Sequence, residues 1–563
     1  MKSIIFTIAL AFIAVNMEAQ VSLQWADRMG GSTNEQGNAI AVDASGNVYT
    51  TGQLSGYGDY DPGSATYTLN TVGNDDIFVS KLDASGNFVW AKRMGGTSND
   101  RAYSIDLDAS GNVYITGEFS SNNADFDPGA GTYTLSSFGQ SDVFVVKLDA
   151  GGNFVWAKQL GSASGLDHGY GIAVDASNNV IVTGDFQGTG DFDPSAATYT
   201  LASNGSFGDI FICKLDGSGN FVWAKNIGST SGDAGNAIDV DAAGNVYTTG
   251  YYKFSTDFDP GPGTFNLNPA SSNPSIFISK LDAAGNFVWA ASFSSSNTNY
   301  GYGIKVDNSG NVLTTGSFQS TVDFDPGSGT YTLNAVGGNA YVNKLDNNGN
   351  FVWAKQMTGS SGEGRSITTD AIGNVYSAGY FPGATDFDPG AGTYTLGTAG
   401  SNDIYIQKLD ANGNFIWAGS MGGPSSDWGT GIAADANNIY TTGYFLNTAD
   451  MDPTAASYTI SVNNAKEIFV VKISNPAAGI NEKIKTNDLS IYPNPSNGSV
   501  CVDMKDKNNS LVEIYNSLGQ LVKTENIPQG KTLIDLQDQV PGLYTLRIYS
   551  GGDSYTGKLL LQK

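Results

Sequence analysis

Tryptophan recurs along this chain at an almost constant interval. Such a regular period is typical of repeat proteins, in which each repeat is one small unit that buries its apolar face against its neighbours. Any fold of this chain must therefore be built from units of about 65 residues. Seven of the eight tryptophans follow one another at spacings of 64 to 67 residues: Trp25, Trp90, Trp156, Trp223, Trp289, Trp353 and Trp417.

Every interval carries the same four phrases, and each phrase reads as a β-strand. In the first complete copy the phrases are AIAVD, NVYTTG, IFVSKL and NFVWAK. Their apolar stretches are short, rich in Val, Ile, Phe and Tyr, and bounded by Asp, Asn and Gly, which is typical of strands and turns. The first and third stretches are apolar at nearly every position, as expected of strands covered on both faces. We therefore predict an all-β protein in which four-stranded sheets stack on one another.

The two ends of the repeat array favour a closed ring over an open solenoid. The array opens with VSLQWADRMGG, a fourth strand without its first three, and closes with IFVVKIS, a third strand without its fourth. Pairing these ends completes the last of seven four-stranded units. A solenoid needs capping units, and the sequence shows none. We predict that residues 20–474 form a seven-bladed β-propeller closed by the N-terminal strand.

The repeat is similar to the bacterial β-propeller repeat family (SBBP). The family pattern of GIAVD, GNVYVTG and a later FVAKLD phrase has a counterpart in all seven copies, between Val21 and Ser474. The resemblance is specific because it recurs seven times along one chain. It implies the propeller fold that the strand pattern predicts.

Three segments outside the array are expected to serve export. Residues 1–19 read as a secretory signal peptide, because a lysine precedes an apolar run of 12 residues, which is too short to span a membrane. No other stretch of the sequence is long and apolar enough for a transmembrane segment. Residues 475–488 read as a linker. Residues 489–563 contain about seven short alternating stretches, which is typical of a small immunoglobulin-like β-sandwich.

The tail resembles the C-terminal sorting domain (type A) of the type IX secretion system. The similarity rests on the phrases YPNPSNG, NSLGQLV, PGLYTLRI and KLLLQK, in this order. It implies that the type IX machinery is a partner and that the protein is secreted, extracellular or attached to the outer-membrane surface. The family's tail is commonly removed after export. The alternative is an ordinary immunoglobulin-like adhesion module, whose deletion would leave export unchanged.

Charge and cysteine content exclude several classes of function. The net charge is −26, from 54 acidic and 28 basic residues, which excludes an electrostatic nucleic-acid binder. Cys213 and Cys501 lie too far apart for a CxxC metal site, and a single histidine rules out a His-rich metal centre. We expect both cysteines to be ordinary strand residues and the protein to be a monomer.

Each repeat contains a long insertion with a DFDPG motif or a variant of it. Asp-Pro-Gly favours a structural turn, which is the interpretation we prefer, whereas two acids at alternate positions are also ligands that calcium accepts. The TYTL phrase that follows is expected to be an extra strand packed on its sheet; the alternative is a set of surface aromatics for sugars. The motifs are residues 59–63, 125–129, 191–195, 257–261, 323–327, 386–390 and 450–454.

The loops that lead into the first strand of each repeat are the best candidates for a ligand site. They lie on the same face as the long insertions and should rim the central channel. They contain residues that differ between repeats, Asp100 and Asp167 among them. The alternative is that solvent-exposed loops simply vary. The candidate ligand-binding residues are Arg101, His168, Tyr300, Arg365 and Trp428.

Catalysis finds little support in the sequence. His168 has no partnered nucleophile in GLDHGYG, and we expect a solvated loop histidine. The carboxylate pairs recur in every repeat, whereas an active site needs one asymmetric constellation. We therefore predict a secreted or cell-surface binding protein, not an enzyme, with a polysaccharide or protein ligand and no cofactor unless calcium binds. The alternatives are a polysaccharide-active enzyme on the loop-rich face and a structural adhesion component.

Overall fold

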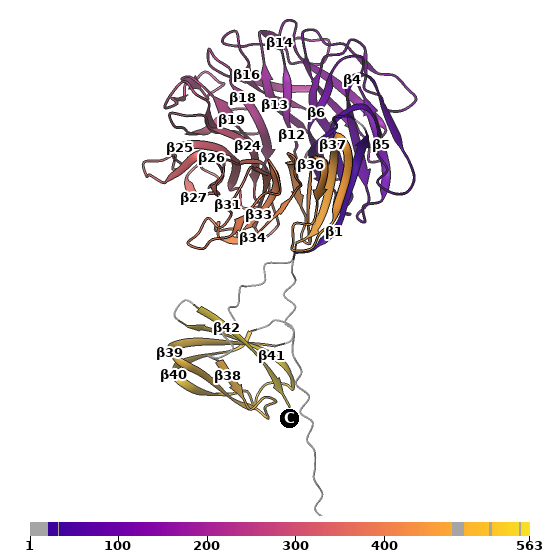
Figure 1. The fold of residues 1–563 in the computed structure, drawn as a ribbon. Coiled ribbons are helices and arrows are strands. Elements are labelled where there is room, and N and C mark those ends of the chain that lie inside the picture. Colours follow the sequence, from indigo (N-terminus) through magenta and orange to yellow (C-terminus); the bar gives the residue numbers. More distant parts are fainter. Residues whose placement is uncertain (1–20, 32, 476–488, 517–520, 551–552, 563) are drawn as a thin grey trace, which may run out of the picture. The chain divides into compact units, whose positions relative to one another are not determined.

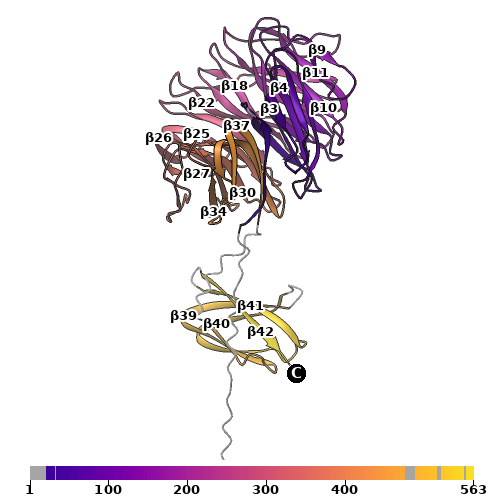
Figure 2. The ribbon, with the colours of Figure 1, turned by 45° about the vertical axis from the view of Figure 1, so that its right-hand side comes forward.

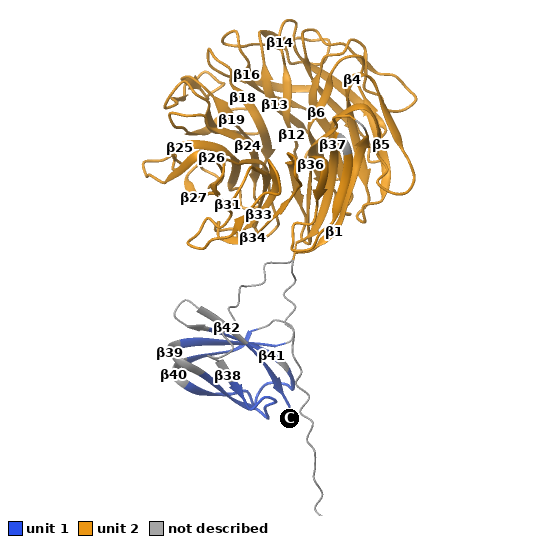
Figure 3. Cartoon of the chain, in the orientation of Figure 1, with its two compact units in different colours: residues 1–19, 477–563 blue, residues 20–476 orange. Residues whose placement is uncertain are grey.

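The computed structural model describes residues 21–31, 33–475, 489–516, 521–550 and 553–562. Over these residues the chain forms strands and turns and contains no helix, so the all-β prediction is confirmed. The predicted signal peptide and, apart from Asn475, the predicted linker lie outside the described residues. The chain divides into two compact units, residues 20–476 and residues 477–563 together with 1–19 (Figure 3).

The larger unit is built from groups of four antiparallel strands, which we number 1 to 7 in chain order; groups 7 and 1 are joined in one eight-stranded sheet. Groups 1 to 3 are β2 (Gln36–Val42), β3 (Val48–Asp59), β4 (Thr68–Leu82) and β5 (Phe88–Met94); β6 (Asp100–Leu107), β7 (Val113–Phe119), β10 (Asp142–Leu148) and β11 (Phe154–Ser162); and β12 (His168–Val174), β13 (Val180–Phe186), β16 (Asp209–Leu215) and β17 (Phe221–Ile227).

The remaining groups repeat the same order of pairing. Groups 4 to 7 are β18 (Ala234–Val240), β19 (Val246–Tyr252), β22 (Ser275–Leu281) and β23 (Phe287–Phe293); β24 (Tyr300–Val306), β25 (Val312–Asp323), β26 (Thr332–Leu345) and β27 (Phe351–Gln356); β29 (Glu363–Thr369), β30 (Val375–Phe381), β33 (Asp403–Leu409) and β34 (Phe415–Met421); and β35 (Trp428–Ala434), β36 (Asn438–Asp450), β37 (Thr459–Ser474) and β1 (Leu23–Gly31).

The first strands of the groups contact one another in order around a common centre (Figures 1 and 2). Apolar side chains fill the space between neighbouring groups; for example, Val79 of group 1 packs in one cluster with Ile115 and Phe119 of group 2. The third strand β16 is buried along its whole length, as predicted for a strand covered on both faces. The first strand β6 is buried at only some of its positions, so the same prediction is wrong for it, because one edge of the first strands faces the centre. The series of contacts runs through β2, β6, β12, β18, β24, β29 and β35, and β35 contacts β2 again.

The N-terminal strand completes the last group, as the ends of the array predict. Strand β1 pairs antiparallel with β37, from Leu23 opposite Ile473 to Met29 opposite Ile468 (Figure 1). An ion pair of 2.7 Å between Arg28 and Glu467 joins the same two strands. The two ends of the array are therefore held together by a sheet ladder and a charged contact.

The repeated tryptophan marks a contact between neighbouring groups. The indole nitrogen of Trp90, in the fourth strand of group 1, donates a hydrogen bond of 3.4 Å to the carbonyl of Ala150, in the last turn of group 2. Gly152 in this turn has φ +76°, and a methyl group at this glycine would lie 3.0 Å from the Trp90 ring. The period of about 65 residues thus places one indole under the turn of the next group.

The DFDPG insertions form turns that are closed by their own carboxylates. Asp125 Oδ1 accepts hydrogen bonds from the backbone N–H groups of Asp127 and Tyr133, at 3.0 and 2.9 Å. Phe126 between the two acids is buried against Phe144. Among the described residues, no group of three His, Cys, Asp or Glu side chains is placed to hold a metal ion.

The TYTL phrase packs on its sheet, as predicted. Its residues pair with the DFDPG motif, and the Tyr133 ring lies 4.9 Å from the ring of Phe154 in the fourth strand of the same group. In groups 1, 5 and 7 the phrase begins the long third strand. Strand β28 (Thr358–Gly359) follows the fourth strand of group 5 and pairs with an insertion strand of group 6. In groups 2, 3, 4 and 6 the insertion strands are β8 (Ala124–Asp125), β9 (Thr134–Leu135), β14 (Thr189–Asp191), β15 (Thr200–Ala202), β20 (Thr256–Asp257), β21 (Asn266–Leu267), β31 (Thr385–Asp386) and β32 (Thr395–Leu396).

The smaller unit contains five strands in its described part, where the sequence predicts about seven. Two of the strands are long, and each takes up two of the short stretches that the sequence suggests. Strand β39 pairs with β38, β40 and β41, and an irregularity in its ladder with β40 follows Met504. The five strands are β38 (Leu489–Tyr492), β39 (Ser499–Tyr515), β40 (Leu521–Asp535), β41 (Gly542–Ser550) and β42 (Asp553–Leu561).

Both cysteines lie in strands, as expected, and both are free thiols. Cys213 is fully buried in β16, and Cys501 is partly buried in β39.

Candidate functional site: the mouth of the central channel

The candidate ligand-binding residues lie at the start of the first strands, on the loop-rich side of the central channel. The first strands share seven equivalent positions. Four of the five candidate residues occupy the first of these positions, and each pairs with a residue of the second strand in its group. Arg365 lies two residues further along its strand. We call the equivalent first residues the mouth residues; they are Gln36, Arg101, His168, Ala234, Tyr300, Glu363 and Trp428.

A β-bulge follows the mouth residue in every first strand. The register shifts at the third residue, and a bulge redirects a side chain out of the regular alternation of a strand. These third residues, which we call the bulge residues, line the central channel. They are Asn38, Tyr103, Tyr170, Asn236, Tyr302, Arg365 and Thr430.

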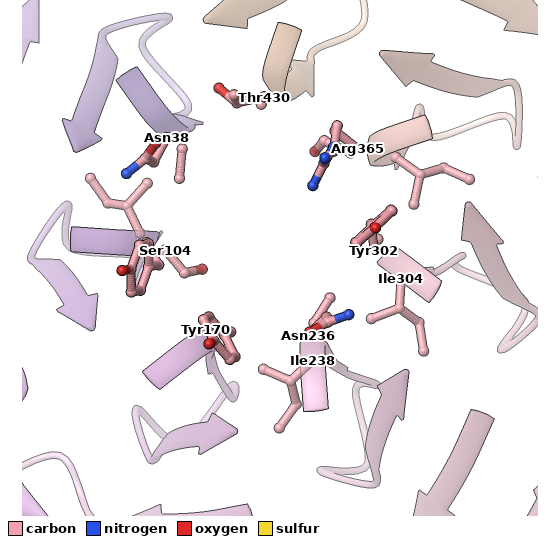
Figure 4. Close-up of a pocket in the computed structure, with 18 of the residues that line it drawn as sticks. Asn38, Ser104, Tyr170, Asn236, Ile238, Tyr302, Ile304, Arg365 and Thr430 are labelled. Atoms are coloured by element: carbon pink, nitrogen blue, oxygen red, sulfur yellow. The ribbon is translucent and has the colours of Figure 1, made fainter. Parts of the chain in front are cut away.

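Figure 4 shows the channel with several bulge residues directed toward its centre. The cavity between them has a volume of about 220 Å³. Its wall combines aromatic rings, amides, hydroxyls and small residues. Of the described residues that line it, Arg365 is the one that carries a formal charge, although the chain as a whole is strongly acidic.

On the side of groups 1 to 3, the mouth carries a network of ion pairs. Arg101 Nη2 lies 2.7 Å from Asp75 Oδ2, and Arg101 Nη1 lies 3.3 Å from Glu118 Oε1. His168 Nε2 lies 3.1 Å from Glu118 Oε2, and His168 Nδ1 lies 2.9 Å from Asp185 Oδ1. The structure therefore brings Arg101 and His168 together through Glu118, a residue that the sequence analysis did not select.

The charge state of His168 follows from these partners. Burial disfavours its charged form, but the hydrogen bonds and negative charges of Asp185 and Glu118 outweigh burial and raise the pKa of His168 to about 10. The pKa of Glu118 is lowered, because its hydrogen bonds and opposite charges outweigh burial. His168 is thus a charged strand residue, and the expectation of a solvated loop histidine is wrong. With both ring nitrogens bound to carboxylates at neutral pH, it has no free nitrogen for a general base.

On the side of groups 5 to 7, aromatic rings surround Arg365. The centre of its guanidinium lies 4.3 Å from the ring centre of Tyr302 and 5.3 Å from that of Trp428, distances typical of cation–π contacts. Glu363 binds Arg365 Nη2 at 2.5 Å. Tyr300 stacks beside Tyr302, with ring centres 5.6 Å apart. The structure therefore links Tyr300 to Arg365 through Tyr302, and Arg365 contacts Trp428 directly.

The stack continues outward from Trp428. Tyr380 stacks on Trp428 with ring centres 4.0 Å apart, and the ring centre of Tyr444 lies 5.8 Å from that of Trp428. Lys466 Nζ lies 4.6 Å above the centre of the Tyr444 ring. These partners come from second and third strands, where the sequence gives one signal: polar and aromatic residues interrupt an otherwise repeated phrase.

Asp100 and Asp167 belong to the architecture of the loops. Asp100 is fully buried and accepts hydrogen bonds from Ser121 Oγ and the N–H of Gly96, both at 2.7 Å. Asp233 and Asp427 bind their own loops in the same way. The expectation that Asp100 and Asp167 are particular to single loops is therefore wrong, because the position recurs.

The far end of the channel contains a second charged cluster that the sequence analysis did not select. Lys305 Nζ lies 3.0 Å from Asp239 Oδ2, and burial raises the pKa of the nearby Asp106 to about 6. All three residues occupy first strands, at positions where most other strands carry a neutral residue. A charged residue inside an apolar strand phrase is the signal that would have revealed them.

Both units contain segments that match a family model. Residues 89–127 and 155–188 match the model of the β-propeller repeat, and residues 490–562 match the model of the secretion system C-terminal sorting domain. The chain carries β-propeller repeats and a type IX sorting tail. The tail indicates export to the cell surface or the extracellular space and interaction with the type IX secretion machinery. The described part of the chain has no helix with the length and hydropathy that a membrane crossing requires.

The curated and solved relatives are distant. An uncharacterized WD repeat-containing protein of Acanthamoeba polyphaga mimivirus is 24% identical over 499 residues, which cover 75% of this chain and 36% of that protein. A dihydro-heme d1 dehydrogenase aligns at a TM-score of 0.33 and 11% identity, over 82% of this chain and 73% of its own. A fungal alcohol oxidase in complex with copper aligns at 0.35 and 14%, over 96% and 99%. At these TM-scores the likeness carries no argument about the chemistry of this chain.

Proposed function

We propose that this chain is a secreted or cell-surface binding protein whose ligand site is the mouth of a seven-bladed β-propeller. Groups 1 to 7 are the blades, residues 20–474 form the propeller, and residues 475–488 link it to residues 489–563, an immunoglobulin-like sandwich. The repeated four-strand pairing and the contact of β35 with β2 support a closed ring. The five candidate residues at one end of the channel support the site.

The ligand that fits this mouth is a carbohydrate that bears a carboxylate. The cavity of about 220 Å³ is far larger than the roughly 10–15 Å³ that one water molecule requires, so it can admit a sugar ring. Its aromatic wall offers ring faces, and aromatic faces stack on the apolar face of a sugar. The bulge residues Asn38 and Asn236 donate their side-chain amides to neighbouring carbonyls, which leaves their side-chain oxygens to accept sugar hydroxyls.

Arg365 supplies the charge preference, and it is the observation that carries the proposal. Its guanidinium face rests on Tyr302, and one edge binds Glu363. A guanidinium has five N–H donors, so donors remain after one ion pair has formed. Arg365 is the one charged residue among the described residues that line the cavity, and its partner Glu363 lies outside that lining, so an anionic group that enters the channel meets the arginine first.

The same contacts favour binding over catalysis. The carboxylates of the mouth, Glu118 and Asp185, are each bound to His168, and Glu363 is bound to Arg365. An acid–base pair needs groups that are free to exchange protons with a substrate. We therefore propose a role as a recognition module without enzymatic activity.

A glycan array probed with the full chain tests the proposal. Glycans that carry a uronic or sialic acid should be printed beside their methyl esters, which keep the shape and remove the charge. We expect binding to some acidic glycans and loss of that binding in the esters and in Arg365→Asn, a residue that two equivalent positions already contain. If the chain binds neutral glycans and this binding depends on Trp428, the mouth remains the ligand site, but the preference for a carboxylate is rejected. No glycan binding at all would reject the proposal.

A further inference from the structure

Five interfaces between neighbouring groups bury two carboxylates side by side. One belongs to the third strand of a group and is called the third-strand acid here; the other belongs to the loop or strand start that follows and is called the loop acid. Every member is at most 3% exposed. The pairs are Asp76 with Asp100, Asp142 with Asp167, Asp209 with Asp233, Asp403 with Asp427, and Glu467 with Glu35.

A glycine allows the two carboxylates to meet. Gly161 has φ +148°, and a methyl group at this position would lie 2.8 Å from Asp142 Oδ1 and 2.7 Å from Asp167 Oδ2. The first pair repeats this arrangement: a methyl group on Gly95 would lie 2.7 Å from the third-strand acid and 2.9 Å from the loop acid. In these two pairs an oxygen of each acid therefore lies close to the same point beside the glycine.

The hydrogen bonds of the two acids are unequal. The loop acid Asp167 accepts the N–H of Ser162 at 2.5 Å and the N–H of Gln187 at 2.9 Å, one on each oxygen. The third-strand acid Asp142 accepts the N–H of Phe138 and the amide of Gln159, both on Oδ2. Its Oδ1 is buried, faces the loop acid and has no hydrogen-bond partner among the described residues.

The same orphan oxygen recurs in the other pairs. Oδ1 of Asp76, Asp209 and Asp403 is buried without a partner, and in the glutamate pair the orphan is Glu35 Oε2. A buried carboxylate oxygen that lacks a donor is costly, because burial removes its hydration without replacement. A feature that recurs five times in one ring needs a common explanation.

We propose that each pair holds one proton, carried on the orphan oxygen and donated to the facing carboxylate. The protonated acid becomes an O–H donor, so the orphan oxygen and its neighbour satisfy each other. The partner acid keeps its negative charge, which backbone N–H donors stabilise. Two carboxylates in contact cannot both ionise cheaply, and one shared proton removes the repulsion between them.

The two remaining interfaces support this interpretation. In group 4 the equivalent positions hold Ser275 and Asn299, and in group 5 they hold Asn339 and Gly362. Both acids are thus present or both are absent, never one alone. If these acids served only to anchor their loops, one ionised acid at an interface would be enough. Sharing a proton requires two acids.

The electrostatic surroundings point the same way. Burial is the largest cause that raises the pKa of Asp142 to about 6, and burial together with the charge of Asp142 raises that of Asp167 to about 7. Basic groups moderate three of the other pairs: Arg93 binds Asp76 at 2.8 Å, Lys253 acts on Asp233, and Arg28 binds Glu467 at 2.7 Å. The donors to Asp142 and Asp167 among the described residues are backbone N–H groups, the Gln159 amide and the Ser162 hydroxyl, all of them neutral, so this pair offers a clear test.

The consequence is that the ring becomes less stable as pH rises. An acid whose pKa is raised in the folded state binds its proton more tightly there than in the unfolded chain, whose aspartates titrate near 3.9. Between the two values the folded state holds more protons, so the free energy of unfolding falls as pH increases. For these pairs the loss extends from about pH 4 to above pH 7.

Two isosteric variants of one pair separate this account from a structural one. In Asp142→Asn the amide oxygen still accepts from Phe138 and Gln159, and the amide nitrogen replaces the protonated oxygen as a donor to Asp167. We expect its melting temperature to exceed that of the native chain by several degrees at pH 8 and to match it at pH 5.5. In the control Asp167→Asn the amide nitrogen must face a backbone N–H, so the melting temperature should fall at both pH values.

Tryptophan fluorescence of the full chain is the appropriate signal, because all eight tryptophans lie in the larger unit. An Asp142→Asn variant that is unchanged, or is less stable at pH 8, overturns the proposal. Infrared spectroscopy of the native chain gives a second readout: buried protonated carboxyl groups should be visible at pH 6 and should disappear at high pH. A rise in melting temperature with calcium that Asp142→Asn abolishes would assign the pairs to a metal ion instead.

Discussion

On one side of the channel mouth the cations are enclosed by acids, and on the other side the cation rests on aromatic rings. Arg101 and His168 share Glu118 and each have a further carboxylate partner, Asp75 or Asp185. Arg365 has one carboxylate, Glu363, and lies over Tyr302. Arg101 and His168 are mouth residues, whereas Arg365 is a bulge residue two positions further along the same repeated strand.

From this difference we infer two roles: the cations enclosed by acids stabilise the fold, and the cation on the aromatic rings binds the ligand. A cation between two carboxylates has its charge compensated and links neighbouring groups, so its removal should affect stability. A cation on a ring face keeps donors for an incoming group, so its removal should affect binding. Each of the following changes tests one side of this comparison against the other.

The largest expected effect is the loss of binding in Arg365→Asn. A hydrogen bond to a charged group contributes about 1.5–3 kcal/mol, so the affinity for an acidic glycan should fall at least about tenfold. Isothermal titration of the full chain measures this change. The matched control is Arg101→Gln, which removes a cation from the enclosed side and should leave the affinity within about twofold. Equal losses in both variants would contradict the assignment of the two sides.

His168→Gln should lower stability without affecting binding. The folded-state pKa of about 10 lies above the unfolded value, so the stabilising contribution is complete below about pH 6.5 and is lost as pH rises through 10. We expect the free energy of unfolding to fall by about 1.5–2 kcal/mol at pH 6. At pH 10.5 the variant and the native chain should be similar. Urea titrations at the two pH values measure the difference, and a loss that is independent of pH would rule out the charged pair.

Trp428→Ala should weaken binding by roughly fivefold, because an aromatic contact is worth about 1 kcal/mol. The variant reproduces the alanine that Ala234 already places at an equivalent position, so folding should be retained. Titration calorimetry with a neutral and an acidic glycan separates the two roles of the ring. Weakening confined to the acidic glycan would show that Trp428 acts only by positioning Arg365.

The smallest expected effect belongs to Lys466→Gln. Lys466 lies over Tyr444 at the outer end of the stack, and an exposed cation–π contact contributes about 0.5–1 kcal/mol to stability. Since it does not line the cavity, the affinity should change by less than about twofold. A larger loss would extend the site beyond the bulge residues.

Much of the fold could be predicted because the same strand phrases recur seven times in the sequence. The tryptophan period, the four strand phrases and the orphan strand at Trp25 determine the pairing of β1 with β37. The tail lacks this redundancy. In the tail, β39 and β40 are each one long strand where the sequence suggests two short strands. Alternation of polar and apolar residues does not by itself reveal whether a polar segment ends a strand.

The candidate site could be predicted only in part. Arg101 and His168 stand out because they break the repeat, but their partners Glu118 and Asp185 lie 17 residues later and meet them only through the register of the sheet. The bulge that directs Tyr302 and Arg365 into the channel leaves no marker in composition. Contacts that depend on register and on local irregularity require the three-dimensional structure.

The central claim, that the mouth recognises a carboxylate through Arg365, is tested most directly by a double-mutant cycle. The affinities of the native chain and of Arg365→Asn are measured for the best acidic glycan and for its methyl ester. The account predicts that the ester binds the native chain at least about tenfold more weakly and that Arg365→Asn no longer distinguishes the two. Independent, additive losses from the ester and from the substitution would contradict it.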